Sequence, residues 1–545
     1  MSISGLFDIG KSALFASQAA LSVTSNNIAN MNTPGYTKQD IILNIAHPVT
    51  TSAGAIGQGV SVAGITRSYD QFIQAQLLGQ QQSQGRSAAM DQAWGQIEQV
   101  FNEAQSMGLS TSLSAYFNAW QDVAVNPASP SQRIVLLQKA NMLTVTAQSM
   151  ERSITATLDN TNASITDAAR QVNGLATDIA KLNDQIVQHE AGSNTKSAND
   201  LRDQRDQKLN DLAKLIDFSV YEDNNGSITV TVGMRNLVSG LKTNPLSSVK
   251  NADGNQDLFL DGMNITGNIQ QGQIGGLIAV RNDVKSSALT GLRKMVASIT
   301  QQINDLHTQG YDLNGNAGID FFNPLQLSTT SSSAGAGITA ATITNPALLT
   351  LDEYRITFAG GNYSVYNKQS GALVSPPTAY NPAGTTITLP GMSIDISGPA
   401  TNADFFTISP LTNAISNFGV AVTDPQKVAA ALTTGGPGNP IPGDNGIALQ
   451  IAALTDTAQS SLGNTTFSGY YSGIVSTVGS MKQVAADSLT FDNKLVSALT
   501  ARRDSISGVS LDEEAANLIR FQRSYEAAAR MISVADDLMK TLMNI

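Results

Sequence analysis

The sequence predicts a mainly α-helical protein with a β insert: a terminal coiled-coil pair of helices, an elongated helical-bundle core domain and a small all-β inserted domain. Two observations predict the helices, because apolar residues recur every seventh position at both ends of the chain and again along residues 154–186. A third observation predicts the insert, since short alternating apolar runs separated by Gly, Pro and Asn occupy residues 345–410.

The chain has 545 residues, which is too long for one hydrophobic core. We therefore expect three units. The terminal unit combines residues 1–70 with 511–545, the helical core combines 71–330 with 411–510 and includes short β segments, and the β-rich insert spans 331–410.

The terminal unit begins with an amphipathic helix over residues 3–30. Its apolar stripe has a spacing of seven residues and consists of Phe7, Leu14, Leu21 and Ile28. The helix should end near Asn30, because Thr33 precedes a proline and Pro34-Gly35 suits the centre of a type II turn.

The core is expected to contain one long helix. Ser129 is a suitable N-cap and Pro130 a suitable first helical residue. Further along, two heptad positions form a coiled-coil seam: Leu158, Ile165, Val172, Ile179 and Ile186 on one, and Ile154, Ala168, Leu175 and Leu182 on the other. Other helices are expected at 69–103, 197–217 and 277–310, and strands at 41–66 and 227–233.

The insert is predicted from five short runs that alternate like strands: YRITF, YSVYN, TTITLP, SIDIS and FFTIS. The stretch before them, STTSSSAGAGITAATITNP at 328–346, has the composition of a flexible connector. A second connector is expected at 433–446, after which helical periodicity resumes. The insert therefore interrupts a helical domain.

The C-terminal tract has a second strict heptad pattern. One position holds Leu518, Tyr525, Ile532 and Met539, and the other holds Phe521, Ala528, Ala535 and Leu542. Ser510 as N-cap, with Glu513 three residues later, predicts a capping box at the start of this helix.

The two terminal helices are expected to pair. Pairing buries about ten large apolar side chains but orders ~65 residues, so the pair should be marginal. We therefore expect disordered or fraying termini in the single chain, which fold when identical copies cover the remaining faces. The alternative is an ordinary helix pair within one core. For assembly, the predicted interface residues are Phe7, Leu14, Leu21, Ile28, Leu518, Phe521, Tyr525, Ile532, Met539 and Leu542.

The stretch NNIANMNTPGY at 26–36 contains four asparagines and no charged residue. Two interpretations remain open. It is an uncharged surface that pairs with identical copies, or its asparagines merely cap the helix and serve a turn. The chain as a whole has only 14% charged residues, which favours the first, because each surface charge in a homopolymer risks meeting its own copy.

Composition excludes several function classes. A net charge of -11 opposes nucleic-acid binding, which depends on clustered Lys and Arg. The absence of cysteine excludes disulfides, thiolate metal sites and cysteine nucleophiles. The N-terminus has no basic leader with an apolar run, so we expect no conventional secretory signal, and no segment is long enough to insert in a membrane.

We expect no catalytic, metal or cofactor site. DLNGNAGID at 312–320 has Asp312, Asn314 and Asn316 at alternating positions, but it lacks the glycine and the bidentate glutamate of a calcium loop. His189 occupies a seam position and His307 lies in a helical tract, and neither belongs to a triad or a metal-ligand pattern. The sequence therefore indicates a protein that is not an enzyme.

The stretch NNIANMNTPGY resembles the shared N-terminal motif of the flagellar axial family, which comprises the rod, hook and hook-associated proteins. The motif residues carried over are Asn27, Asn30, Asn32, Pro34, Gly35 and Tyr36. The ending SLDEEAANLIRFQRSYEAAARMISVADDLMKTLMNI is similar to the hook-associated branch of this family. NDLRDQRDQKLNDLAKLIDFSV, QIGGLIAVRNDV and DLNGNAGIDFF are also similar to it.

This resemblance implies a secreted structural subunit of the bacterial flagellum, located outside the cell at the junction of hook and filament. Its implied partners are identical subunits in a helical ring, the hook protein, a second junction protein, and an export chaperone of the type III apparatus. The implied chaperone-binding residues are Leu518, Phe521, Tyr525, Ile532 and Leu542. The alternatives are another axial protein (hook or flagellin-like), or a secreted cell-wall-acting enzyme or an adhesin carried on a helical stalk.

Overall fold

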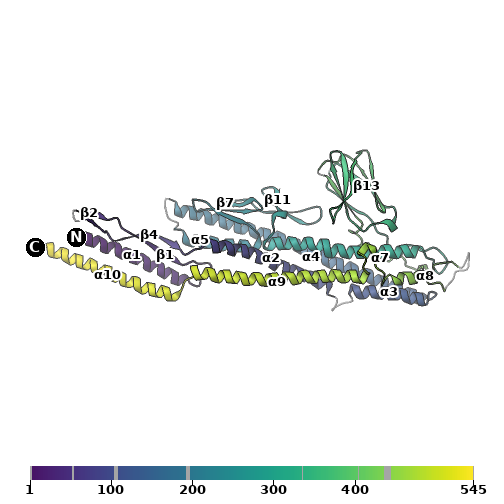
Figure 1. Ribbon diagram of the computed structural model, residues 1–545, viewed down its shortest axis with the longest axis horizontal. Helices are drawn as coiled ribbons and strands as arrows, with labels where there is room; N and C mark the ends of the chain where they lie inside the picture. Colours follow the sequence, from purple (N-terminus) through teal and green to yellow (C-terminus); the bar gives the residue numbers. More distant parts are fainter. Residues whose placement is uncertain are drawn as a thin grey trace.

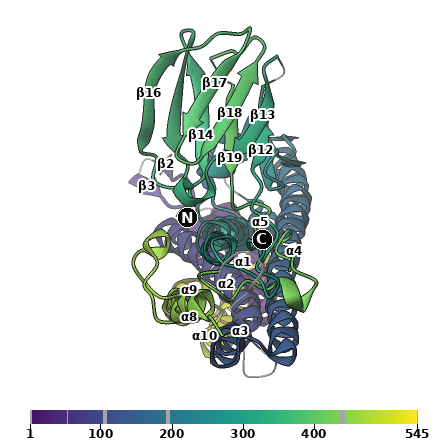
Figure 2. The same cartoon turned by 90° about the vertical axis from the view of Figure 1, so that its right-hand side faces the viewer.

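The computed structural model describes residues 3–51, 54–102, 108–191, 197–333, 335–402, 404–434 and 443–543. The molecule is elongated, with long helices running along one common axis (Figure 1). Both termini lie at one end, and a β domain projects from the side of the bundle near the other end (Figures 1 and 2).

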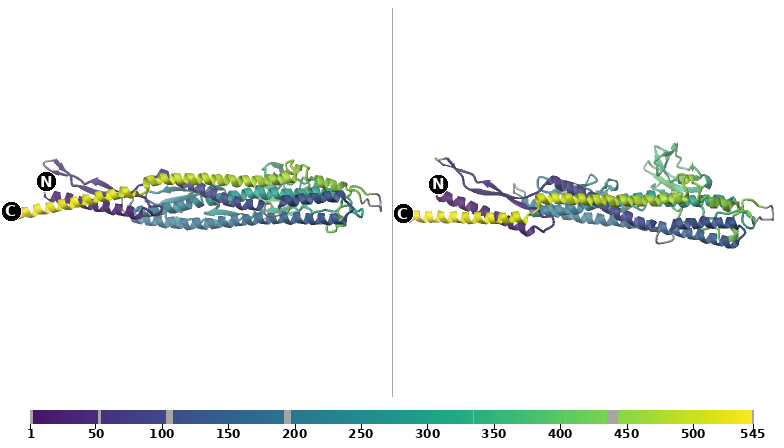
Figure 3. Two further views of the ribbon diagram at one scale, coloured as in Figure 1. Left: turned by 90° about the horizontal axis from the view of Figure 1, so that it is seen from below. Right: turned by 60° about the horizontal axis from the view of Figure 1, so that its bottom comes forward.

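The terminal unit is formed by both ends of the chain. Its helices are α1 (Ile3–Asn30) and α10 (Leu511–Met543), which lie side by side (Figures 1 and 3). Its strands are β1 (Gln39–Ile45), β2 (Val49–Thr51), β3 (Gly54–Ile56) and β4 (Val60–Arg67). β1 pairs antiparallel with β4, and β2 with β3. The predictions of a helix over 3–30, of strands over 41–66 and of a C-terminal helix are confirmed.

The core is a bundle of helices from both halves of the chain. They are α2 (Gln71–Phe101), α3 (Leu109–Val125), α4 (Pro130–Glu190), α5 (Asn199–Leu215), α6 (Gly272–Asp283), α7 (Thr290–Thr308), α8 (Gly446–Ala453) and α9 (Phe467–Ser507). A π-helical segment, Val284–Leu289, joins α6 to α7. Short 3-10 turns lie at Thr266–Asn268, Pro346–Leu348, Pro425–Lys427 and Ser460–Leu462.

The long helix α4 begins as predicted. The Ser129 hydroxyl accepts a hydrogen bond from the Gln132 backbone N–H at 3.4 Å, and Pro130 is the first helical residue. All the predicted seam residues are buried except Leu175, which is half-buried. They pack in the core of this chain, where α4 contacts α3, α5 and α6. The prediction that His189 occupies a position in the buried seam was wrong, because this side chain is exposed in the last turn of α4.

Two small antiparallel sheets lie on the bundle. One has the strand order β5 (Ser219–Glu222), β6 (Ile228–Val232), β7 (Arg235–Ser239), β8 (Lys242–Thr243). The other has the order β11 (Met263–Asn264), β10 (Gln256–Leu260), β9 (Ser247–Lys250). The prediction of a strand at 227–233 is confirmed, and the remaining strands of these sheets were not predicted.

The insert consists of two antiparallel sheets around its own apolar core. The first sheet has the order β12 (Ser328–Ser331), β19 (Phe405–Ser409), β14 (Tyr354–Ala359), β15 (Asn362–Asn367), β16 (Leu373–Ala379). The second has the order β13 (Gly337–Ile343), β18 (Met392–Ser397), β17 (Thr385–Leu389). The five predicted strands are confirmed as β14, β15, β17, β18 and β19.

The expectation of a flexible connector at 328–346 is wrong. This segment supplies β12, which pairs with β19, and β13, which pairs with β18. The alternation of Thr and Ile with small residues lets it complete both sheets despite its high content of Ser, Gly and Ala. Of the second expected connector, residues 435–442 lie outside the described residues.

Candidate assembly interface

The paired terminal helices approach each other closely. A Cβ atom added to Gly10 of α1 would lie only 2.9 Å from Cγ1 of Ile532 in α10, so any larger residue would force the Ile532 side chain to shift. The most buried apolar side chains of the two helices are also small: Ala16, Ala20, Val23, Ala528 and Ala535. Small residues let the backbones come together, but they leave most of the large apolar side chains near the edges of the contact.

The predicted interface residues are therefore covered only in part. Six of them are half-buried: Leu14, Leu21, Ile28, Leu518, Phe521 and Ile532. Four of them are exposed: Phe7, Tyr525, Met539 and Leu542. Leu542 retains 65% of its accessible surface, so the C-terminal end of α10 is the least covered part of the helix pair.

Other exposed apolar residues of the terminal unit were missed by the sequence analysis. On α10, Met531, Val534 and Leu538 are exposed beside the predicted stripe. Their i, i+3, i+7 spacing was the signal that could have revealed them. The strands and α1 add six more: Phe15, Ile42, Leu43, Ile45, Val49 and Val62. The unit thus exposes apolar side chains on several of its faces, as expected of a surface that other chains cover.

The asparagine-rich stretch lies at the opposite, inner end of the helix pair. The amide of Asn27 is 1% exposed, and its nitrogen donates to the Gln39 carbonyl at 2.9 Å and to the Glu514 carboxylate at 3.1 Å. Its oxygen accepts from the Gln39 backbone N–H at 3.0 Å and from the Tyr36 hydroxyl at 2.8 Å. One side chain thus ties α1 to β1 and to the first turn of α10.

The rest of the stretch forms the turn after α1. The Asn30 amide donates to the backbone carbonyl of Asn26 at 3.1 Å and to its side chain at 3.0 Å. The Tyr36 N–H closes the turn on the Thr33 carbonyl, with Gly35 at a φ of 83°, which is the conformation that a type II turn requires. Asn32 and Pro34 are exposed. Asn26, Asn27 and Asn30 therefore make contacts within the chain. This agrees with the interpretation that the asparagines cap the helix and serve a turn.

The segment after the turn is held by the core helix α5. The Thr37 backbone and hydroxyl both donate to the Asp203 carboxylate, at 2.9 and 2.8 Å. The Gln39 side chain donates to Asp200 at 2.6 Å. Arg67 at the end of β4 donates to both Asp203 and Asp206 at 2.7 Å. This set of contacts between Thr37, Gln39, Arg67 and α5, together with Asn27 and Glu514, is called the joint below.

Burial raises the pKa of two acidic groups at and beside the joint. Desolvation raises the pKa of Asp203, although hydrogen bonds from Arg67 and Thr37 oppose the shift. Burial also raises the pKa of the Tyr36 hydroxyl, and the carboxylates of Asp200 and Asp203 add to the effect. Lys38 lies between Glu513 at 3.3 Å and Glu514 at 3.7 Å. The predicted helix start after Ser510 is confirmed, while the Glu513 carboxylate pairs with this lysine.

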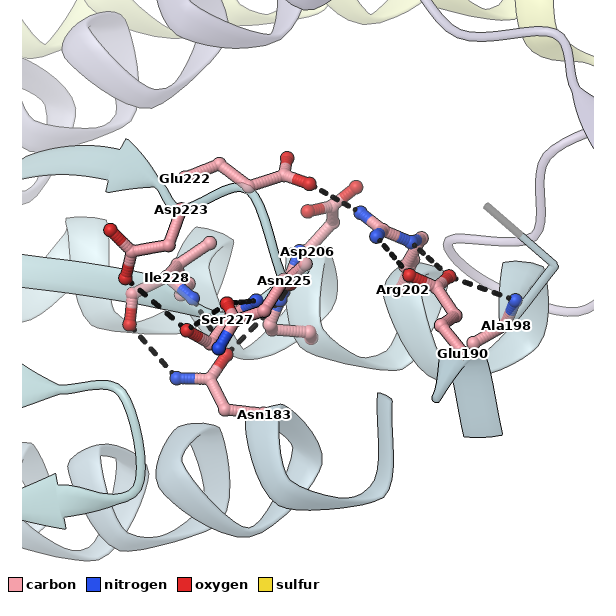
Figure 4. Close-up of polar contacts among 12 residues, drawn as sticks. Asn183, Glu190, Ala198, Arg202, Asp206, Glu222, Asp223, Asn225, Ser227 and Ile228 are labelled. Atoms are coloured by element: carbon pink, nitrogen blue, oxygen red, sulfur yellow. Dashed lines mark hydrogen bonds and ion pairs between the residues drawn. The ribbon is translucent and has the colours of Figure 1, made fainter. Parts of the chain in front are cut away.

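Helix α5 is itself fixed by a polar network on its other flank (Figure 4). The Arg202 guanidinium donates to Glu190 and to Glu222, both at 2.8 Å, and is almost fully buried. Asn183 of α4 donates to the Ile228 carbonyl at 2.9 Å. Such bidentate, buried pairs are rigid, so the joint is connected to a firmly held core.

Two of the residues considered for chemistry, His307 and Asp312, are occupied by structural contacts. His307 is fully buried; its Nδ1 contacts the Ile319 carbonyl at 2.5 Å, and its Nε2 accepts from the Ala429 N–H at 2.8 Å. Burial lowers the pKa of His307 to about 4, so it is neutral at pH 7. The Asp312 carboxylate accepts the backbone N–H groups of Asn314 and Asn316, at 2.8 and 2.9 Å. Within the described part of the chain, no group of three or more acidic or His side chains could hold a metal ion.

The described helices also include none with the length and apolarity needed to cross a membrane.

Family models match both ends and the middle of the chain. The flagella basal body rod protein model matches residues 7–37, the model of the helical domain of flagellar hook-associated protein FlgK matches 94–322, and the C-terminal model of the flagellar basal body rod FlgEFG proteins matches 503–545. The chain is 31% identical to flagellar hook-associated protein 1 of Salmonella typhimurium, with 100% of both chains covered. The chain belongs to the flagellar hook-associated protein 1 family.

Other comparisons agree with this family. Flagellar hook-associated protein 1 of Escherichia coli is 30% identical with both chains fully covered, and that of Bacillus subtilis is 27% identical over 98% of this chain and 97% of the relative. The solved flagellar hook junction protein FlgK from Burkholderia pseudomallei matches with a TM-score of 0.69 at 20% identity, covering 79% of this chain and 100% of that chain. The family's fold, mainly helical with small sheets, is therefore the fold of this chain.

Proposed function

We propose that this member of the hook-associated protein 1 family is a non-catalytic subunit of the junction between the flagellar hook and filament. One observation carries the proposal: similarity to named hook-associated proteins extends over the whole chain, including both terminal helices. The exposed apolar side chains of the terminal unit support assembly as the mechanism, because a single chain leaves them in water.

The assembly interface is formed by the ten predicted residues of α1 and α10. Their partial exposure supports this role, since a half-covered apolar stripe gains stability when a neighbour covers the rest. The family motif serves this interface indirectly, because the joint fixes the angle at which the core presents the terminal helices.

The partners are identical subunits in a ring, the hook protein on one side and a second junction protein on the other. The chaperone-binding residues Leu518, Phe521, Tyr525, Ile532 and Leu542 lie along α10, whose side chains are mostly exposed. A chaperone therefore has access to this stripe before assembly. The acidic net charge of -11 supports the absence of nucleic acid among the partners.

We also propose that the chain functions as three units. Residues 1–70 and 511–545 form the assembly unit, 71–330 and 411–510 the supporting core, and 331–410 the insert. The apolar core of the insert supports this division, because its buried residues lie within 331–410 apart from Ala297, Leu411 and Ala414.

Removing the protein from its source bacterium tests the proposal. Cells that lack this chain should build hooks but no filaments, and filament protein should appear in the medium, because no junction retains it. Wild-type copies supplied in trans should restore filaments. Normal filaments on cells without the chain would refute the proposal.

A further inference from the structure

The terminal unit has three layers, with α1 between the β1–β4 hairpin and α10. On one side of α1, the Ser12 hydroxyl contacts the Val60 N–H at 3.4 Å, and a Cβ on Gly59 would meet the Ile9 backbone at 3.3 Å. On a different side, Gly10 meets Ile532 of α10. Figure 1 shows the hairpin and α10 separated by α1 in this way. The hairpin and α10 of one chain are therefore held apart by α1.

The hairpin carries an unusual surface. Residues 41–65 contain no Asp, Glu, Lys or Arg. Four large apolar side chains of β1 and β4 are exposed: Ile42, Leu43, Ile45 and Val62. Ile45 retains 87% of its accessible surface, and Val49 of the adjoining strand β2 is exposed as well. Ile42 and Leu43 are both exposed at a register shift in the pairing of β1 with β4. An exposed, uncharged two-stranded ribbon of this kind is marginal in water unless another chain covers it.

Helix α10 carries a matching surface beyond its contact with α1. Val534 is 55% exposed and Leu538 is 48% exposed, with Met531 beside them. The nearby charged residues Arg530, Asp536, Asp537 and Lys540 sum to zero net charge, and Asp536 and Lys540 form an ion pair of 2.6 Å. This second stripe therefore also has a low net charge and a large apolar content.

The two surfaces lie at the same level of the molecule. Ile45 pairs with Val60 across the hairpin, and Val60 contacts Ser12 of α1. Ile532, which is adjacent to Met531 and Val534, meets Gly10 only two residues from Ser12. A copy of the chain displaced sideways, without a shift along the axis, would bring its Met531–Val534–Leu538 stripe to the hairpin of the first.

We propose that the β1–β4 hairpin of one copy packs on the Met531–Val534–Leu538 stripe of the next copy. The occupant is a second copy of this chain, because both surfaces belong to one chain, lie at one level, have no net charge to select an oppositely charged partner, and continue the α1–α10 contact. The contact joins two different surfaces, so it is heterologous and repeats from copy to copy around an axis. This inference rests on the proposed function and identifies which residues neighbouring subunits share.

Engineered cysteines test the contact without competing native thiols, since the chain has no cysteine. Two differently tagged variants, Ile45→Cys and Met531→Cys, are produced together in the source bacterium, and isolated flagella are treated with a mild oxidant. A disulfide requires Cα atoms within about 7 Å, so it reports direct contact. We expect a mixed dimer carrying both tags, and no dimer when either variant is produced alone.

A matched control is Val145→Cys, which places a thiol on an exposed apolar position of the core helix α4. It should give no dimer with Ile45→Cys. Flagella that contain both variants but yield Ile45–Ile45 dimers, or no Ile45–Met531 dimer, would overturn the inference while leaving the proposed function intact. Absence of the tagged chains from isolated flagella would instead refute the proposed function.

Discussion

Replacing Asn27 with alanine is expected to loosen the joint selectively. The substitution removes one amide that serves the Gln39 N–H, the Gln39 carbonyl and the Glu514 carboxylate, and Gln39 and Glu514 are both buried. A buried polar group left without its partner costs about 1–3 kcal/mol. Three such groups amount to about 3 kcal/mol even at the lower figure, which is roughly a hundredfold change in a local opening equilibrium.

Amide hydrogen exchange in the full-length monomer measures this effect. The Gln39 N–H and its neighbours in β1 and β4 should exchange about a hundred times faster in Asn27→Ala, while amides of α4 keep their wild-type rates. Asn32→Ala is the matched control, because Asn32 is exposed in the same stretch. Equal rates in Asn27→Ala and the wild type would refute the argument that this side chain holds the joint.

Three further predictions concern packing and pH. The double variant Phe521→Asp, Ile532→Asp should abolish filaments but keep the thermal unfolding of the core, and motile cells would count against the proposed interface. Gly10→Val should lower assembly in the same assay, because a Cβ meets Ile532 at 2.9 Å; unchanged filament number would contradict the close approach. Burial lowers the pKa of His307 to about 4 from the ordinary value of about 6.5, so protonation favours unfolding. The contribution of neutral His307 to the free energy of unfolding is complete above pH 6.5 and should fall by about 3 kcal/mol between pH 6.5 and 4. Denaturant unfolding of the wild type and of His307→Gln across this pH range measures the fall. Parallel pH profiles of the two proteins would contradict the prediction.

Local signals in the sequence were sufficient for most helices. Pro34-Gly35 ended α1 and Ser129-Pro130 began α4, because proline and capping chemistry act within a few residues. Heptad spacing identified the buried face of α4, because burial on a helix follows its period.

Strand pairing was harder to predict. Ser and Gly content obscured β12 and β13, whose stability depends on partners about 50 to 80 residues away in the chain. β16 was missed because Pro376 and Pro377 argue against a strand, yet it lies at the edge of its sheet, where proline is tolerated.

The assembly interface was only partly predictable. The stripe of α1 and α10 was found from its period, but nothing local shows that Asn27 meets Glu514, which lies 487 residues away. The expectation that the terminal segments are unordered in a single chain also differs from the structure, in which α1 and α10 are helical and packed together. Their burial is uneven: the buried and half-buried side chains of α10 reach as far as Ala535, and beyond Ala535 every described side chain of α10 is exposed.

The central claim is that the outer parts of the terminal helices depend on neighbouring copies for their stability. Hydrogen exchange of residues 3–12 and 531–543, compared between the dilute monomer and intact flagella, tests it most directly. We predict rapid exchange in the monomer and strong protection in flagella, with the joint protected in both. Equal protection of these two segments in monomer and flagella would contradict the claim.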